Sequence, residues 1–109
     1  MSTASAQHDP APVFAALGDR TRLSLVIRLS DGQSRSIAKL ASDTKLTRQA
    51  VTKHLRVLEE AGLVGSVRVG RESRFAYRPD AVEEARSFLR TISSQWDEAL
   101  GRLREFVER

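Results

Sequence analysis

Residues 46–64 read LTRQAVTKHLRVLEEAGLV, and this stretch decides the fold. Its apolar residues recur at steps of one, three and four, which places them on one stripe of an α-helix. Thr47 offers a hydroxyl as the N-cap, and Gly62 is a natural residue to end the helix. Such a helix leaves its opposite face for water, another protein or the base edges of DNA. That face carries polar, mostly cationic side chains: Thr47, Arg48, Gln49, Thr52, Lys53 and Arg56.

Three shorter helices are predicted before this one, over residues 12–17, 20–30 and 36–43. Asp19 is expected to cap the second, and Ser34 or Ser36 the third. The third helix and residues 47–61 are joined by a short polar connector. Two helices with so brief a turn between them are typical of a helix-turn-helix, in which the second is the candidate recognition helix.

The apolar period then changes from 3.6 to 2. Residues 63–69 and 74–79 alternate apolar with polar side chains, and residues 70–73 lie between them. This predicts a β-hairpin with a charged tip, packed on the helices because a lone hairpin is unstable. Pro79 is expected to begin a last helix. The fold class is therefore mainly α with a small β-hairpin, in the order α-α-α-α-β-β-α.

The last helix carries a heptad seam at alternating steps of three and four: Val82, Ala85, Leu89, Ile92, Trp96, Ala99, Leu103 and Phe106. A helix over about residues 79–108 is about 45 Å long, too long for a small domain to bury. We expect a homodimer through the terminal helices, with Val13, Phe14 and Leu17 of the first helix also at the interface. The alternative is a seam within one chain. Residues 1–10 are interpreted as a disordered tail, and residues 11–109 as one domain.

Charge is concentrated in the middle of the chain. Residues 20–78 carry 13 basic and 5 acidic side chains, whereas the whole chain of 109 residues has a net charge of +4. This distribution is typical of a nucleic-acid footprint, the alternative being a solvated basic surface. The chain has no cysteine and no apolar run long enough to span a membrane, so we expect a cytoplasmic protein with no membrane partner.

The candidate recognition helix has side chains suited to DNA. A recognition helix reads the major groove through its N-terminal half, where Arg48 matches guanine and Gln49 matches adenine. Thr52 suits a base or a thymine methyl, and Lys53 a phosphate. Thr47 can cap the helix and offer its hydroxyl to a phosphate.

Other candidates have an open alternative. His54 either contacts DNA or bonds to the fold, and Arg56 either contacts a phosphate or is solvated. The hairpin tip adds Arg68, Arg71 and Arg74, which either reach the backbone and minor groove or form a solvated loop.

Three segments carry a resemblance to a known family: FAALGDRTRLSLV, LTRQAVTKHLRVLEEAGLV and RVGRESRFAYRP. They resemble the arsenical-resistance-repressor (ArsR) family of bacterial winged helix-turn-helix repressors, over about residues 12–80. The resemblance implies a dimeric repressor on double-stranded DNA with an inverted-repeat operator, of a kind that is often autoregulatory. Residues 38–41 and the last helix lack the family's metal ligands, which implies the subgroup without metal or other cofactor.

The remaining function classes are weaker. No nucleophile-and-base pair, phosphate-binding glycine loop or metal cluster is visible, so an enzyme is not expected. A winged-helix protein–protein interaction module stays open as the alternative. A small-molecule effector is unknown: an oxygen-ligand metal site at Asp97 and Glu98, or an apolar ligand near Phe14, Trp96 and Leu100, is only a hypothesis.

Overall fold

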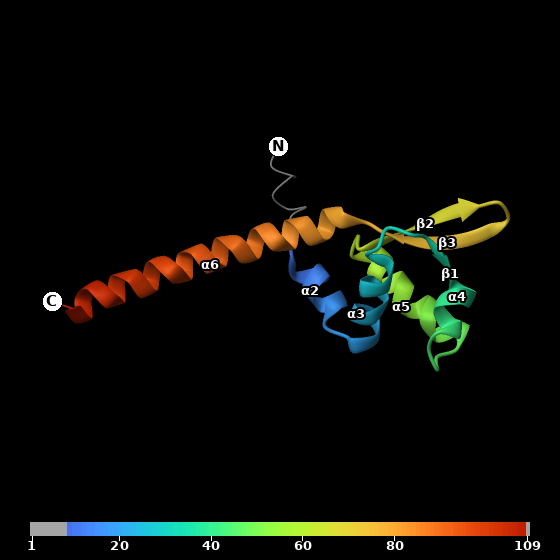
Figure 1. The fold of residues 1–109 in the computed structure, drawn as a ribbon, viewed down its shortest axis with the longest axis horizontal. Coiled ribbons are helices and arrows are strands. Elements are labelled where there is room, and N and C mark those ends of the chain that lie inside the picture. The colour runs from blue at the N-terminus through green and yellow to red at the C-terminus, as the bar shows by residue number, and fades with distance from the viewer. Residues whose placement is uncertain (1–8, 109) are drawn as a thin grey trace.

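The computed structural model describes residues 9–108 and has an elongated shape, with extents of 68 × 39 × 21 Å (Figure 1). A body of four helices lies at its centre, a hairpin extends from one side, and a long helix extends from the other. The elements in order are α2 (Ala11–Leu17), α3 (Arg20–Leu29), β1 (Arg35–Ser36), α4 (Ile37–Ser42), α5 (Arg48–Glu60), β2 (Val64–Val69), β3 (Glu72–Tyr77) and α6 (Pro79–Glu108).

The predicted caps are confirmed. Asp19, Ser36 and Thr47 each accept a hydrogen bond from the backbone N–H three residues on, so α3, α4 and α5 begin where their capping side chains stand. Helix α5 ends at Gly62, which has φ +79, and two backbone hydrogen bonds close the helix there. Its N–H donates to the Glu59 carbonyl, and the Leu63 N–H donates to the Leu58 carbonyl. This arrangement satisfies two carbonyls at the helix end.

One cluster of apolar side chains forms the core, between the helices of the body and the sheet. Helix α5 contacts α2, α3, α4 and β2, so these four elements pack around its apolar stripe. The largest fully buried side chains come from five elements and the segment before β2: Leu25, Leu29, Leu40, Val51, Leu55, Leu58, Leu63, Val64 and Phe75. The stripe expected from residues 46–64 is therefore the one that faces the core.

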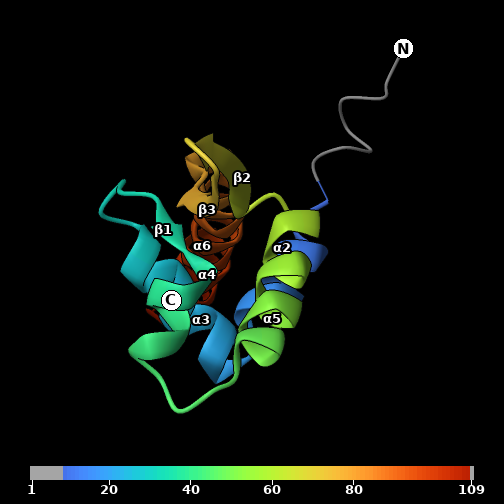
Figure 2. The same ribbon diagram turned by 90° about the vertical axis from the view of Figure 1, so that its right-hand side faces the viewer.

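The sheet has three strands in the order β1-β3-β2, all antiparallel, so the expected two-stranded hairpin is incomplete. Strand β1 pairs Arg35 with Phe75 and Ser36 with Arg74. Two residues are too few to show an alternating pattern, which is why β1 was missed. The sheet lies over one side of the helices, as Figure 2 shows in a view from the tip of the hairpin.

The hairpin tip is also tighter than expected. Val69 pairs with Glu72, so only Gly70 and Arg71 form the turn, whereas residues 70–73 were assigned to it. Gly70 has φ +63, a conformation that glycine adopts without strain. The extra pairing lengthens the ribbon and carries Arg71 to its end.

Two arginine side chains form hydrogen bonds that link parts of the helical body. Arg22 donates from Nε to the Ala16 carbonyl at 2.8 Å, at the end of α2. Arg35 donates from Nη1 to the Arg28 carbonyl at 2.9 Å and from Nη2 to Asp31 at 2.7 Å. Part of the basic charge of residues 20–78 is therefore used to join loops and helix ends.

Helix α6 extends well past the body, and its only buried residue is Ala85. Its N-terminal part packs on α2, where the rings of Phe14 and Phe88 lie 6.2 Å apart. Most of the tail predicted for residues 1–10 lies outside the described residues.

Candidate nucleic-acid interface

The N-terminal half of α5 follows the turn of the helix-turn-helix, and its polar face is exposed. Thr47 Oγ1 accepts a hydrogen bond of 3.1 Å from the Ala50 N–H. The proton of that hydroxyl remains available, so the cap and a phosphate contact are compatible. Arg48, Gln49 and Lys53 are exposed. The three side chains predicted to reach bases and phosphates therefore project from the body together.

Two further polar residues of α5 are partly engaged within the chain. Thr52 is half-buried, and its Oγ1 donates to the Arg48 carbonyl at 2.7 Å, so its methyl group and its acceptor capacity are what it can offer DNA. Arg56 donates from Nη1 to Glu59 at 3.1 Å. Its side chain is nevertheless 62% exposed, which leaves most of the guanidinium accessible.

His54 lies on the flank of α5 that faces α3. Its Nδ1 is 3.9 Å from Asp19 Oδ2, and its side chain is 25% exposed. The hydrogen bond from the Arg22 N–H lowers the pKa of Asp19, with a smaller contribution from the neighbouring His54. Of the two alternatives for His54, this geometry favours contact with the fold.

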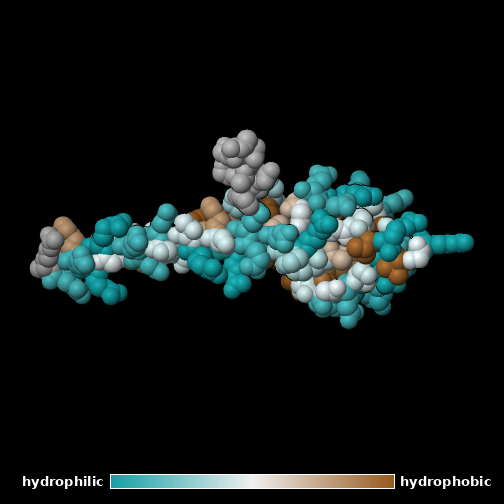
Figure 3. Space-filling view, turned by 90° about the horizontal axis from the view of Figure 1, so that it is seen from above, coloured by the Kyte–Doolittle hydropathy of each residue, from teal (hydrophilic) through white to brown (hydrophobic). Residues whose placement is uncertain are grey.

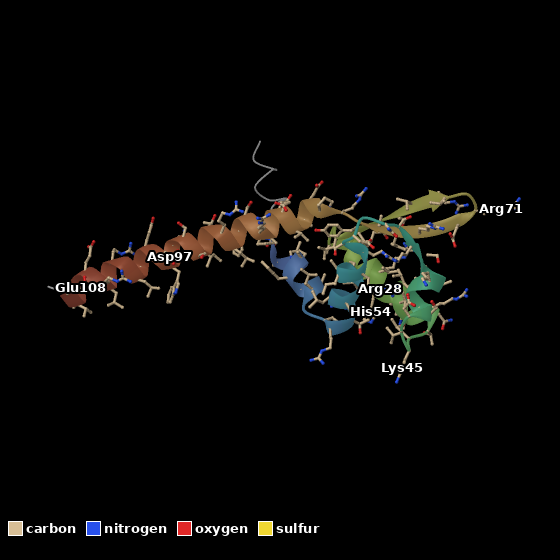
Figure 4. The ribbon with its side chains drawn as sticks, viewed as in Figure 1. Arg28, Lys45, His54, Arg71, Asp97 and Glu108 are labelled. Carbon is tan, nitrogen blue, oxygen red and sulfur yellow. The ribbon has the colours of Figure 1, made fainter. Side chains whose placement is uncertain are left out.

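The wing, defined as β2, β3 and their turn, carries its three arginines in different directions. Arg71 lies at the tip, where Figure 4 shows it extending away from the body. Arg68 pairs in register with Ser73. It lies two residues after Ser66 on β2, and Ser66 contacts α5. Arg68 therefore lies on the face of the ribbon turned toward α5, because side chains two apart share a face.

Arg74 has the opposite orientation and a partner. It stands across from Val67, one position out of phase with Arg68, so it lies on the other face of the ribbon. Its Nε donates to Glu72 Oε1 at 2.7 Å. Arg68 and Arg71 thus provide most of the cationic reach of the wing, whereas the charge of Arg74 is largely compensated by Glu72.

A side-chain contact that no sequence pattern indicates joins the wing to α5. Ser66 Oγ donates to Glu59 Oε2 at 2.9 Å. This hydrogen bond and the adjacent Arg56 guanidinium lower the pKa of Glu59. The residues are seven apart and belong to elements of different period, so no local pattern signals the pair. The hydrogen bond is a direct side-chain link between the two cationic surfaces, in addition to the core packing of Val64 and Phe75.

The residues predicted for a dimer interface divide into two groups. Val13 and Ala85 are each only 6% exposed and belong to the core, so they have little surface left for a partner. Leu89, Ile92 and Leu103 are about half exposed, and Trp96 and Phe106 are 64% and 74% exposed. Ala99 is half-buried. The seam is thus covered at its start and uncovered along the rest of α6.

A nearly apolar cavity of about 260 Å³ lies where the covered and uncovered parts of the seam meet. Phe14 and Leu17 of α2 line it together with Val82, Ala85 and Leu89 of α6. On the face seen in Figure 3, hydrophobic patches interrupt the hydrophilic surface along α6 and near the wing. The opening toward α6 is suited to an apolar side chain.

Residues 9–108 offer neither a metal site nor a membrane-spanning helix. No group of three or more His, Cys, Asp or Glu side chains there is arranged to hold a metal ion. In the same range, no helix combines the length and apolarity that crossing a membrane requires.

Comparisons with known proteins agree with this geometry. The helix-turn-helix domain family matches residues 17–67. An uncharacterized HTH-type transcriptional regulator of Bacillus subtilis, YuzN, is 43% identical over 65 residues, which are 54% of this chain and 71% of the relative.

Solved structures extend the likeness to the whole chain. An ArsR-like transcriptional regulator from Rhodococcus sp. RHA1 is 35% identical with a TM-score of 0.84, covering 99% of this chain and 97% of that one. A homodimeric winged helix-turn-helix DNA-binding domain from Mycobacterium bovis shares the fold at 22% identity and a TM-score of 0.65, covering 87% of this chain and 88% of that one. The chain belongs to the ArsR-like family of winged helix-turn-helix transcriptional regulators.

Proposed function

We propose that the protein is a homodimeric repressor that binds an inverted-repeat operator and blocks transcription by occupying the promoter. The observation that carries the proposal is the joint exposure of the N-terminal half of α5 and the α5-facing side of the wing. Arg48, Gln49 and Lys53 are exposed on the first, and Arg68 is exposed on the second. One surface enters the major groove while the other follows the backbone.

Base reading is assigned to Arg48 and Gln49. Arginine forms paired hydrogen bonds with guanine O6 and N7, and glutamine with adenine N6 and N7. Lys53, Arg56, Arg68 and Arg71 are assigned to phosphates, which position a protein but carry no sequence information. Thr47 donates its free hydroxyl proton to a phosphate at the helix N-terminus, where the helix dipole also favours an anion. Thr52 contributes its methyl group or acceptor.

Dimerisation is part of the proposed mechanism because one chain offers few contacts. Each neutralised phosphate adds to the electrostatic part of the affinity, and that part weakens with salt. For six to ten contacts, the affinity falls about 10³–10⁵-fold between 50 and 200 mM salt. A single α5 and wing supply only about half of that number. Two chains double the contacts and hold two recognition helices about 34 Å apart, one turn of DNA.

The exposed part of α6 supports a second copy of this chain as the partner. Its apolar residues keep a heptad spacing from Leu89 to Phe106, and a self-complementary seam is what a twofold interface requires. The apolar cavity beside Phe14 and Leu17 continues this seam onto α2, so a side chain of the partner helix can fill it. The homodimeric relative from Mycobacterium bovis has the same fold, which agrees with this arrangement.

Footprinting on DNA upstream of the protein's own coding region tests the proposal. We expect two protected half-sites related by twofold symmetry, with centres about 10–10.5 base pairs apart or a multiple of that spacing. The double variant with Arg48→Ala and Lys53→Ala should lose protection, whereas Arg102→Ala, on the exposed part of α6, should retain it. Protection that ignores sequence, or is unchanged in the double variant, would refute the assignment of α5 as the reading helix.

A further inference from the structure

A cavity of about 300 Å³ lies between α3 and the turn that precedes α5. Arg20, Arg28 and Lys45 line it, and the lining includes no carboxylate. Figure 4 shows Lys45 at the lower edge of the helical body and Arg28 near its middle. Three cations around one hollow form an environment that favours an anion.

The charges around this cavity are incompletely compensated within residues 9–108. Arg28 pairs with Asp43 through Nη2, but its Nη1 is buried and has no hydrogen-bond partner there. Within the same range, the side chains of Arg20 and Lys45 have no ion-pair partner. A buried N–H without a partner is costly, and a rotation of the Arg28 side chain that brings Nη1 to an acceptor in the cavity would remove that cost.

The rest of the lining is suited to an organic molecule with an anionic group. Thr21 and Ser24 contribute hydroxyls, and Leu46 contributes apolar surface, whereas the Thr44 hydroxyl proton is already donated to the Ala41 carbonyl. Phosphate and carboxylate groups bond well with guanidinium and hydroxyl groups. A small apolar body attached to the anion can lie against Leu46, which is half-buried.

The walls of the cavity belong to the parts that orient the recognition helix. One wall is α3, and the other is the turn just before the Thr47 cap. Thr44 Oγ1 shapes that turn: it donates to the Ala41 carbonyl and accepts from the Leu46 N–H, both at 3.1 Å. The ion pair between Arg28 and Asp43 joins the turn to α3. An occupant would therefore contact both α3 and the turn that leads into α5.

We infer that this cavity binds a small organic phosphate or carboxylate, and that its occupancy changes the affinity of α5 for DNA. The regulatory step rests on the proposed function, whereas binding of the anion does not. Linkage requires the effect to be reciprocal: a ligand that weakens DNA binding is itself bound more weakly by the DNA complex.

The first test is binding of inorganic phosphate and of phenyl phosphate to the DNA-free protein, at constant ionic strength set with chloride. Amide resonances of Thr21, Ser24, Thr44 and Lys45 should shift together and saturate, and phenyl phosphate should bind more tightly than phosphate. The variant with Arg20→Gln and Lys45→Gln should weaken binding about tenfold or more, since it removes two charged donors. The matched control, Arg102→Gln, should bind as the wild type does. Shifts that are scattered, fail to saturate or persist unchanged in the double variant would overturn the site.

The second test separates a free ligand from a DNA phosphate as the occupant. Phenyl phosphate should change operator affinity at constant ionic strength in the wild type and leave it unchanged in the double variant. The double variant should keep the wild-type dependence of operator affinity on salt. A salt slope smaller by about one or two would show that the cavity accepts the DNA backbone, and would overturn the small-ligand assignment. An operator affinity that phenyl phosphate leaves unchanged would overturn the regulatory step, even if the first test succeeds.

Discussion

Ser66 Oγ of β2 lies 2.9 Å from Glu59 Oε2 of α5, and this hydrogen bond joins the wing to the recognition helix. Glu59 also accepts a hydrogen bond from Arg56 Nη1, so one carboxylate contacts both β2 and a cationic side chain of α5. This pair adds a surface contact to the core packing of Val64 and Phe75, which already places the strands of the wing against the helices.

The first prediction concerns this pair. Ser66→Ala should lower the free energy of unfolding by about 0.5–1.5 kcal/mol, the usual net value of one hydrogen bond. It should also weaken operator binding, because the variant removes the side-chain link between α5 and the wing that is seen beside the core packing. Denaturant unfolding and DNA titration measure the two effects. Ser73→Ala, an exposed serine on the same ribbon, is the control, and an equal loss of DNA affinity in both variants would contradict the role of the pair.

The second prediction separates base reading from phosphate contact. Arg48→Ala should cost about 1–3 kcal/mol on the preferred operator and relax preference at one base position. Lys53→Ala should weaken all sequences alike and reduce the salt slope by about one. Binding selections at several salt concentrations measure both. If the two variants lose affinity uniformly, Arg48 does not read bases.

The third prediction concerns oligomeric state. Leu89→Glu combined with Leu103→Glu should give monomers in sedimentation experiments, because two charges on the exposed seam of α6 oppose its burial. The control combines Ser87→Glu with Ser94→Glu, which adds the same charge to the opposite side of α6 and should leave dimers intact. A dimer that survives the leucine changes would place the interface elsewhere.

The fourth prediction follows from the ion pair between Asp31 and Arg35. The hydrogen-bonded Arg35 guanidinium, with help from the Gln33 N–H, lowers the pKa of Asp31 from 3.8 to about 2. A pKa depressed in the folded state stabilises the fold above the unfolded value, and that contribution is lost as the pH falls from about 4 to about 2. Thermal unfolding should show Asp31→Asn less stable than the wild type above this range. The difference should disappear below it, and a difference that does not depend on pH would contradict the assignment.

The fifth prediction uses two glycines in different conformations. Gly62 has φ +79 at the end of α5, so Gly62→Ala should destabilise the fold by roughly 1–2 kcal/mol. Lack of space is not the cause, because an added Cβ would lie 3.7 Å from Ala81 Cβ, an ordinary contact. Gly101 lies inside α6 with open space around it, so Gly101→Ala should stabilise by about 0.5–1 kcal/mol. Denaturant unfolding at one chain concentration should show opposite signs, and matching signs would contradict the argument.

Sequence alone predicted the features that arise within a few residues of chain. Helix and strand periods, the caps at Asp19, Ser36 and Thr47, and the glycine end of α5 are all local, and each is confirmed. The long C-terminal helix is likewise confirmed as α6. These features depend on hydrogen bonds and side-chain spacing that the order of residues specifies directly.

The roles of individual cations could not be predicted in this way. Arg22, Arg35 and Arg74 look like Arg48 or Arg68 in the sequence, but each is bonded to a carbonyl or carboxylate of its own chain. A charged side chain is free or engaged according to which acceptor the fold brings near it. That acceptor belongs to another element, and only the packed structure determines its position.

The same reason separates the rest of the fold into what sequence determined and what tertiary structure decided. The order of residues determined a winged helix-turn-helix with a long apolar-seamed helix. Tertiary structure decided that Val13 and Ala85 belong to the core, that residues 35 and 36 form a strand, and that His54 faces Asp19. Periodicity and capping are short-range, whereas burial and pairing require segments remote in sequence to meet, which only the folded chain establishes.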